Sequence, residues 1–145
     1  ARGAGKPSGA TIPLKGPGWW KTVKPSASEG GNRYHQQVTG RPASQVYVID
    51  NIEYDGFKDN ILREAKGPGY RAFFEKNGRP KNWYRLSGKF EQLMLQAKKQ
   101  SRMAERVGFR LRWHVAEGDV AGFLRRHFEQ AGLANIEVLH TPVTP

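Results

Sequence analysis

The chain has 145 residues, of which 24 are Lys or Arg and 13 are Asp or Glu, so its formal net charge is +11. The absence of cysteine excludes disulfides and zinc sites built on thiolates, and no run of about 18 apolar residues is present to cross a bilayer. The length is sufficient for one domain with its own core. A surface this basic favours polyanions: nucleic acid first, then an anionic membrane or an acidic protein partner.

Residues 1–33 are rich in Gly, Pro, Ser and Lys, a composition typical of irregular chain. Within them, the pair Trp19-Trp20 is too apolar for a free linker, and we expect it to pack on the domain or on a partner. A short helix with a serine N-cap is predicted over residues 28–37. Because the chain begins without Met, we expect it to be the C-terminal module of a longer protein.

Residues 46–66 carry the pattern of β-strands. Apolar side chains alternate with polar ones between residues 46 and 54, with a turn predicted at residues 50–51. A second two-residue turn at residues 59–60 leads into a strand that begins at Ile61. The segment is therefore predicted to fold as consecutive hairpins.

The turn at residues 59–60 decides which side chains meet across the second hairpin. It pairs Asp55 with Glu64, and Cβ atoms of directly opposed residues lie about 4.5–5.5 Å apart. Lys66 shares a face with Glu64 because side chains alternate along a strand. The predicted register therefore gathers Asp55, Glu64 and Lys66 in one patch, which a slip by one residue would disperse.

This patch suits metal-dependent hydrolysis of a phosphodiester bond. Two neighbouring carboxylates repel each other unless a proton or cation lies between them, and Mg²⁺ takes oxygen ligands of this kind. Such a metal acidifies a bound water, and Lys66 would orient that water or neutralise the developing charge. Glu53, on the same face as Asp55, is a candidate additional ligand. The residues alone leave open the alternative of a solvent-facing hairpin with cross-strand ion pairs.

The rest of the chain alternates helices with strands, as judged from the periodicity of its apolar residues. A domain of this kind belongs to the α/β class, with a mixed central sheet flanked by helices. In chain order, the remaining elements are a helix over residues 86–107 ended by Gly108, a strand over 109–114, a helix starting at Val120, a strand starting at Ile136 and a frayed tail at 141–145.

Residues 70–85 interleave aromatic and basic side chains. Cations in such a segment contact phosphates without reading sequence, and Tyr70, Trp83 or Tyr84 could stack on an exposed base. We expect the phenylalanines to be buried and the cations to face solvent, where they would also attract an acidic inhibitor. The candidate nucleic-acid-binding residues are Arg71, Lys76, Arg79, Lys81 and Arg85.

Several stretches carry a resemblance to a known family: residues 34–40 (Tyr-His-Gln-Gln-Val-Thr-Gly), 54–57 (Tyr-Asp-Gly-Phe), 62–70 (Leu-Arg-Glu-Ala-Lys-Gly-Pro-Gly-Tyr) and 113–117 (Trp-His-Val-Ala-Glu). The chain resembles the restriction-endonuclease-fold toxins of bacterial polymorphic toxin systems over residues 34–130. The resemblance implies a PD-(D/E)xK nuclease core in which Asp55 and Glu64 bind the metal and Lys66 is catalytic. The chain departs from the family pattern in lacking a Pro before Asp55 and in carrying Tyr54 instead of Phe.

The resemblance also implies a biological context. We expect a metal-dependent DNase toxin domain with Mg²⁺ as cofactor and DNA as substrate. It would be delivered by a secreted effector, often through type VI secretion, act in the cytoplasm of a competitor cell, and be neutralised by a cognate, acidic immunity protein. No membrane partner is expected. An RNase on the same fold and a non-catalytic nucleic-acid-binding module remain the alternatives.

Enzymes with the PD-(D/E)xK core often carry a further polar residue near the metal. Gln37 on the first helix fits the family stretch best, and Gln96 with Gln100, four apart on the main helix, are candidates to face the site or the phosphate backbone. For each of these residues a surface role is the alternative. The expected organisation is an irregular segment at 1–33, a nuclease toxin domain at 34–140 and a tail at 141–145.

Overall fold

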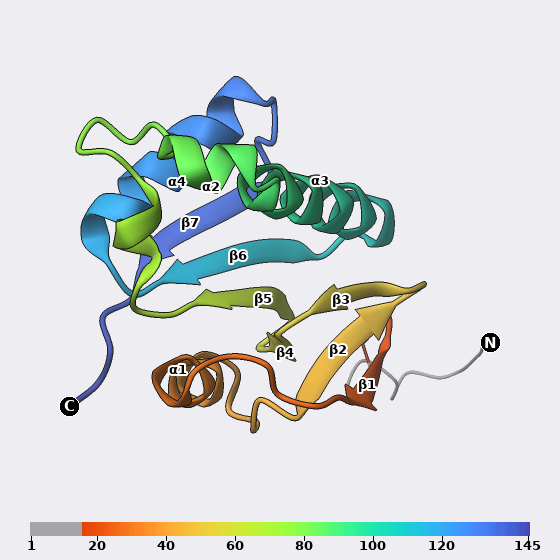
Figure 1. The fold of residues 1–145 in the computed structure, drawn as a ribbon. Coiled ribbons are helices and arrows are strands. Elements are labelled where there is room, and N and C mark those ends of the chain that lie inside the picture. Colours follow the sequence, from red (N-terminus) through yellow and green to blue (C-terminus); the bar gives the residue numbers. More distant parts are fainter. Residues whose placement is uncertain (1–15) are drawn as a thin grey trace, which may run out of the picture.

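A computed structural model describes residues 16–145 (Figure 1). The predicted irregular chain at residues 1–15 lies outside the described residues. The elements are β1 (Trp19–Thr22), α1 (Glu29–Thr39), β2 (Gln45–Ile49), β3 (Ile52–Tyr54), β4 (Gly56–Lys58), β5 (Ile61–Lys66), the short 3₁₀ helix η2 (Tyr70–Phe73), α2 (Asn82–Leu86), α3 (Lys89–Val107), β6 (Arg110–Val115), α4 (Gly118–Gln130) and β7 (Ile136–His140).

The strands form two sheets, and the chain passes directly from one sheet to the other between β3 and β4. A mixed sheet has the order β4-β5-β6-β7, with β4 antiparallel to β5 and the other pairs parallel. An antiparallel sheet has the order β1-β2-β3, and Asp55 joins β3 to β4. Helix α1 covers one face of the mixed sheet, while α2, α3 and α4 lie on the other (Figure 1). The predicted α/β class with a mixed sheet between helices is confirmed.

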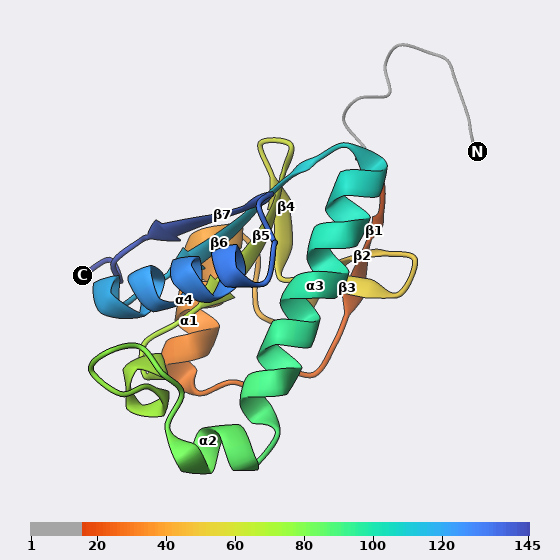
Figure 2. The same cartoon turned by 90° about the horizontal axis from the view of Figure 1, so that it is seen from above.

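Helix α3 bridges the two sheets, since it contacts both β3 and β6 (Figure 2). The core between the helices and the mixed sheet is built around Trp113, which is fully buried and packs edge-on against Phe128 with ring centroids 5.0 Å apart. Leu62 and Leu111 from the two central strands belong to the same core. None of the helices within residues 16–145 combines the length and the apolar character required to cross a membrane.

Both predicted hairpin turns are present. Asp50 and Asn51 have φ angles of 45° and 69°, and Asp59 and Asn60 have φ angles of 55° and 62°. Two successive residues in the left-handed region define the tight turn that matches the twist of paired strands, and Asp and Asn tolerate this region better than most residues. The second turn pairs Lys58 with Ile61, which is the predicted register.

One predicted helix is confirmed and another begins at a different residue. Helix α1 has Ser28 as its N-cap, whose hydroxyl accepts a hydrogen bond from the Gly31 amide at 3.1 Å, so this predicted helix is confirmed. The single helix predicted over residues 86–107 is wrong at its start. Gly88, with a φ of 82°, separates α2 from α3, because a left-handed residue cannot continue a right-handed helix.

The expectation of irregular chain over the first part of the domain is wrong at β1. Strand β1 pairs with β2, and Trp20 packs edge-on against Tyr47 with ring centroids 5.2 Å apart. The guanidinium of Arg41 lies 3.9 Å from the centre of the Trp20 ring. Trp20 thus packs on the domain as predicted, while Trp19 is 56% exposed. The division of the chain at residues 33 and 140 stays a prediction.

Gly56 should not tolerate a side chain. A Cβ atom there would lie 2.6 Å from the side chain of the buried Thr39 on α1. We expect Gly56→Ala to lower the free energy of unfolding in urea by about 1–3 kcal/mol through overpacking. Gly122→Ala, on α4 with no atom within 4 Å of the added Cβ, should raise it by roughly 0.5–1 kcal/mol. Equal stability of Gly56→Ala and the native protein would contradict the close approach of β4 to α1.

Candidate active site

The three residues predicted as a catalytic patch lie together. Glu64 and Lys66 point to one face of the central strand β5 and are only 3% and 7% exposed. The Lys66 ammonium lies 3.0 Å from Glu64 Oε2. Asp55 reaches the same strand from the bend before β4, and its Oδ2 accepts a hydrogen bond from the Ala65 amide at 2.7 Å. The site is therefore built from one hairpin.

The position of Asp55 differs in one respect from the predicted pairing. The ladder between β4 and β5 starts at Gly56 and Arg63, so Asp55 is not a strand partner of Glu64. The chain bends at Asp55, where β3 leaves one sheet and β4 enters the other. This bend turns the Asp55 side chain onto the backbone of β5, which still brings its carboxylate to the Glu64–Lys66 pair.

Two amides of α3 hold the Glu64 carboxylate. Gln96 Nε2 donates to Glu64 Oε2 at 3.0 Å, and Gln100 Nε2 donates to Oε1 at 2.9 Å. Gln96 Oε1 also accepts from the Lys66 ammonium at 3.0 Å, and Gln100 Oε1 accepts from the Trp113 indole at 2.9 Å. The spacing of four residues puts both glutamines on one side of the helix. Both glutamines therefore contact the predicted catalytic pair, and their role in a site stays a prediction.

The environment separates the pKa values of the two carboxyl groups. Burial, reinforced by the charge of Asp55, raises the pKa of Glu64 to about 7. Burial also acts on Asp55, but its hydrogen bond from His35 and the charge of Lys66 hold its pKa below the ordinary value. The pKa of Lys66 is raised because Glu64 outweighs the effect of burial. Asp55 therefore favours its ionised form, whereas the ionised form of Glu64 is disfavoured by burial and by the neighbouring charge.

His35 on α1 is the site residue that sequence reasoning missed. Its Nδ1 lies 3.5 Å from Asp55 Oδ1, and its Nε2 lies 3.1 Å from the carbonyl oxygen of Gln45. The available signal was helical spacing, because the buried face of α1 is formed by Tyr34, His35, Val38 and Thr39. A histidine on that face is directed at the sheet and at the bend that carries Asp55.

Gln37 lies elsewhere, so its predicted position beside the carboxylates is wrong. Its Nε2 donates to the carbonyl oxygen of Pro142 at 2.9 Å, and its Oε1 accepts from the Thr144 amide at 3.1 Å. Tyr34 likewise donates to the carbonyl oxygen of Thr141 at 2.6 Å. These contacts from α1 hold the C-terminal tail in place. The tail has no regular secondary structure, but the prediction that it is frayed is wrong.

Glu53 lines the same pocket of about 600 Å³ as Asp55, in agreement with their predicted common face. Its carboxylate is half-exposed and lies 3.6 Å from the Lys21 ammonium of β1. This distance and exposure describe a solvated ion pair, which contributes little to stability. Glu53 thus lines the pocket, but within residues 16–145 its carboxylate makes no hydrogen bond or ion pair with Glu64 or Lys66.

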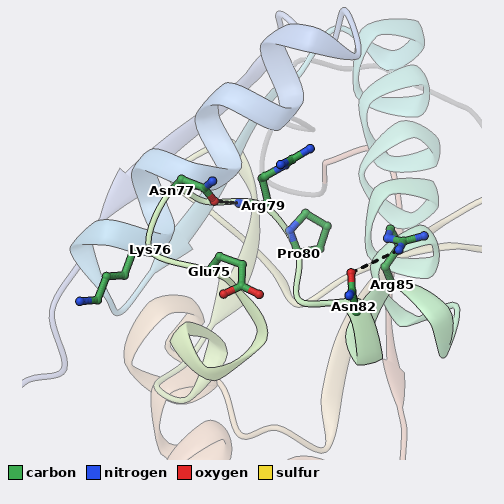
Figure 3. A pocket seen from close by; sticks show the side chains of 7 residues that line it. All are labelled: Glu75, Lys76, Asn77, Arg79, Pro80, Asn82 and Arg85. Carbon is green, nitrogen blue, oxygen red and sulfur yellow. Dashed lines mark hydrogen bonds between the residues drawn. The ribbon is translucent and has the colours of Figure 1, made fainter.

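Three of the five predicted nucleic-acid-binding cations lie around one pocket of about 900 Å³ (Figure 3). Its walls come from the loop after Phe74 and from α2, and a hydrogen bond from the Arg79 amide to Asn77 Oδ1 at 3.0 Å tightens the loop. Lys81 precedes α2 and is half-buried. The pocket is lined by Glu75, Lys76, Asn77, Arg79, Pro80, Asn82 and Arg85.

Arg71 has a different environment from the other predicted cations. Its guanidinium contacts Asp119 Oδ2 at 2.7 Å and Glu117 Oε2 at 3.3 Å, so two carboxylates at the start of α4 offset its charge. The Arg71 amide also donates to Glu117 Oε1 at 2.9 Å. These contacts tie η2 to α4 and offset the positive charge of Arg71.

The aromatic residues of the same segment divide by exposure. Phe74 and Tyr84 are buried, which confirms a core role for Phe74 and excludes Tyr84 as a surface for stacking in this structure. Phe73 is half-buried and stacks on Tyr84 with ring centroids 4.5 Å apart. Trp83 is exposed on α2, and Tyr70 lines the pocket beside Asp55.

The donor set can be compared with the requirements of different metals. Within the described residues, no group of three or more His, Cys, Asp or Glu side chains is arranged to hold a metal ion. Zinc takes four protein ligands in structural sites and three in catalytic sites, so the described residues do not fit that ion. Mg²⁺ binds through one or two carboxylates and retains several waters. Asp55 and Glu64 fit this smaller requirement.

The fold and the site together define a class of protein: an α/β domain with a restriction-endonuclease-like core, in which an aspartate precedes a Glu-x-Lys on the central strand. The family model described as restriction endonuclease fold toxin 5 matches residues 31–118, which include the whole carboxylate–lysine cluster. The chain belongs to this family of toxins, and the membership indicates a nuclease toxin. No curated protein is significantly similar to the chain.

Gln100 should be important for stability as well as for the geometry of Glu64. It is 1% exposed, and Gln100→Leu would leave the Trp113 indole and Glu64 Oε1 without this partner. We expect a loss of about 2–3 kcal/mol in chemical unfolding, because buried polar groups without partners are costly. Gln96→Leu, at a half-buried position where water can replace the amide, should cost less than about 1 kcal/mol. Equal losses would show that the two amides are not distinguished by burial.

Proposed function

We propose that the protein is a metal-dependent endonuclease toxin that hydrolyses phosphodiester bonds in the DNA of a competitor cell. The observation that supports this most directly is the buried Glu64–Lys66 pair beside Asp55, whose side chain lines a pocket. A structural ion pair alone gives no reason for a second carboxylate to lie close enough to raise the pKa of the first. A cation that binds both carboxylates removes this conflict.

Asp55 and Glu64 would hold the divalent metal, which we propose is Mg²⁺. When bound, such an ion acidifies a water molecule and stabilises negative charge on a phosphate. Lys66, fixed between Glu64 and Gln96, places an ammonium where it can donate to a phosphate oxygen or orient the attacking water. Because the group is buried, its charge acts in a low dielectric and needs little reorganisation during the reaction.

The residues around this group have supporting roles in the proposal. Gln100 fixes the orientation of Glu64, and its own carbonyl is held by Trp113. Gln96 links Glu64 to Lys66. Glu53 adds a carboxylate at the pocket without touching the pair. Gln96 and Gln100 have positioning roles in the proposal, because they contact Glu64 and Lys66 rather than adding a metal ligand.

DNA binding is proposed to rely on the basic surface outside the carboxylate cluster. Lys76, Arg79, Lys81 and Arg85 would contact phosphates, and the net charge of +11 would attract the polyanion over a longer range. Arg71 is excluded from this set because Asp119 and Glu117 already occupy its guanidinium.

The family membership supports a toxin that is delivered to a target cell, and we propose its route and its inhibitor as well. Residues 34–140 would form the nuclease domain of a secreted effector, released by type VI secretion into the cytoplasm of the target cell. A cognate immunity protein with an acidic surface would neutralise it, because opposite charge accelerates association with a basic nuclease.

Nuclease activity should depend on the carboxylate–lysine group and on a divalent metal. With Mg²⁺, the native protein should degrade plasmid DNA, whereas Glu64→Gln and Lys66→Ala should each lower the rate by about 10³-fold or more. Removal of the metal with EDTA should abolish activity, because the two carboxylates lose their shared ion. Agarose electrophoresis of plasmid digests measures these rates, with circular dichroism as the test of folding.

Glu91→Gln is the matched control, since it removes one carboxylate from an exposed position on α3. It should retain full activity. Full activity in both Glu64→Gln and Lys66→Ala would overturn the proposed site. Digestion of total RNA but not of plasmid DNA would replace the DNase by an RNase on the same fold. Binding that survives EDTA without cleavage under any metal would indicate the non-catalytic alternative.

Arg79 and Arg71 should respond differently to removal of their charge. Arg79→Ala should weaken DNA binding and lower the slope of log affinity against log salt by about 1, because one phosphate contact is lost. Arg71→Ala should leave this slope unchanged and should lower the melting temperature, because it breaks the contacts to Asp119 and Glu117. Fluorescence anisotropy over a salt series measures both slopes. The same slope change in both variants would contradict the distinction.

A further inference from the structure

The pocket of about 600 Å³ next to Asp55 has chemically distinct sides. Asp55 and Ala65 lie at the end that meets the catalytic hairpin. Tyr70 and Phe73 from η2 line it with aromatic rings. Asn32, in the first part of α1, also lines it. A ligand in this pocket therefore meets aromatic faces, an amide and the carboxylate end together.

The size and walls of this pocket suit a single nucleotide. Pockets of roughly 300–1,000 Å³ hold drug-sized ligands, a size class that includes one nucleotide. Aromatic side chains bind bases by stacking, whatever the base, because every base has a π face. The Tyr70 ring centre lies 5.6 Å from the Lys66 ammonium. A base stacked on Tyr70 would thus be adjacent to a phosphate that Lys66 is proposed to contact.

Asn32 contributes a side-chain amide whose hydrogen-bonding groups are not all satisfied. Its side-chain oxygen is buried and has no hydrogen-bond partner within the described residues, while its amide nitrogen makes one long contact of 3.4 Å to the carbonyl oxygen of Ala27. Buried polar atoms without partners are rare in proteins. An asparagine amide can donate to a base edge, and the Asn32 amide nitrogen, which makes only this one long contact among the described residues, is the group available to do so.

The second large pocket provides a contrast. The pocket in Figure 3 is lined by three cations, two asparagines, Glu75 and Pro80, with no aromatic side chain among them. Such a lining matches a phosphate backbone. The pocket beside Asp55 has the aromatic walls that the basic pocket lacks, and it therefore suits a base.

We infer that the pocket lined by Tyr70, Phe73 and Asn32 binds an unpaired nucleobase next to the scissile phosphate, so that the nuclease acts on single-stranded or locally unpaired nucleic acid in preference to an intact duplex. The inference rests on the proposed nuclease function. A base inside a duplex is stacked and paired, and it must leave the helix before it can enter a pocket of this kind, at a cost of a few kcal/mol. Unpaired substrates do not carry this cost.

Binding to short oligonucleotides with and without bases tests the inference. The experiment uses the inactive Glu64→Gln protein, a fluorescein-labelled oligo-dT and an abasic oligomer with the same number of phosphates. Oligo-dT should bind about 5- to 100-fold more tightly than the abasic oligomer, the range given by stacking of one base. Tyr70→Ala should remove this difference, and Tyr70→Phe, which keeps the ring, should preserve it. Asn32→Ala should reduce it.

Matched controls distinguish base binding in the pocket from stacking on other exposed aromatic residues and from effects of misfolding. Trp19→Ala removes an exposed aromatic residue of β1 and should not change the ratio between the two oligomers. Oligo-U replaces oligo-dT in a parallel titration. If oligo-U also binds more tightly than the abasic oligomer by the same factor, the pocket is supported and accepts bases of RNA as well. If Tyr70→Ala fails to fold by circular dichroism, Asn32→Ala decides the question.

Cleavage rates give the second measurement. The active protein should cut a single-stranded oligonucleotide and a duplex with a central mismatch at least 10-fold faster than the matched duplex. Equal affinity for oligo-dT and the abasic oligomer, or equal rates on all three substrates, would overturn the base pocket. In that event the loss of activity in Glu64→Gln would still support the nuclease, so the two proposals fail separately.

Discussion

The structure depends on a carboxylate and an ammonium buried side by side on its central strand. Removing Glu64 and Lys66 from water is unfavourable, and their attraction offsets this cost only when further hydrogen bonds satisfy the remaining atoms. Gln96 and Gln100 supply those bonds from α3, and Trp113 of β6 holds Gln100 in turn. The crossing of α3 over both sheets can be understood as the arrangement that lets two amides reach one carboxylate.

Much of the carboxylate cluster could be predicted from the sequence because it is local. The turn at Asp59-Asn60 determines the hairpin register, and alternation along β5 then puts Glu64 and Lys66 on one face. The spacing of Gln96 and Gln100 by one helical turn gave them a common direction toward the strand. Only the bend at Asp55 differed, because a chain that passes from one sheet to another cannot continue a regular ladder.

The features that sequence reasoning missed depend on distant contacts. Strand β1 lies in a Gly- and Pro-rich segment and exists through its pairing with β2. Arg71 resembles any exposed arginine until the fold brings it to Asp119, 48 residues later in the chain. His35 required knowledge of which face of α1 is buried, and Gln37 was assigned to the wrong face for the same reason. Local patterns do not contain this information.

The sequence separations within the site predict an order of assembly during folding. The hydrogen bond between Asp55 and Ala65 closes a loop of only ten residues, whereas Gln100 reaches Glu64 across 36 residues, after the chain has passed through η2 and α2. Short loops close at a lower entropic cost than long ones, and long-range pairing slows folding. We therefore expect the carboxylates to meet first in a hydrated hairpin. Desolvation of Glu64 then belongs to a later step, in which α3 and β6 dock and the charged hairpin becomes the interior of the protein.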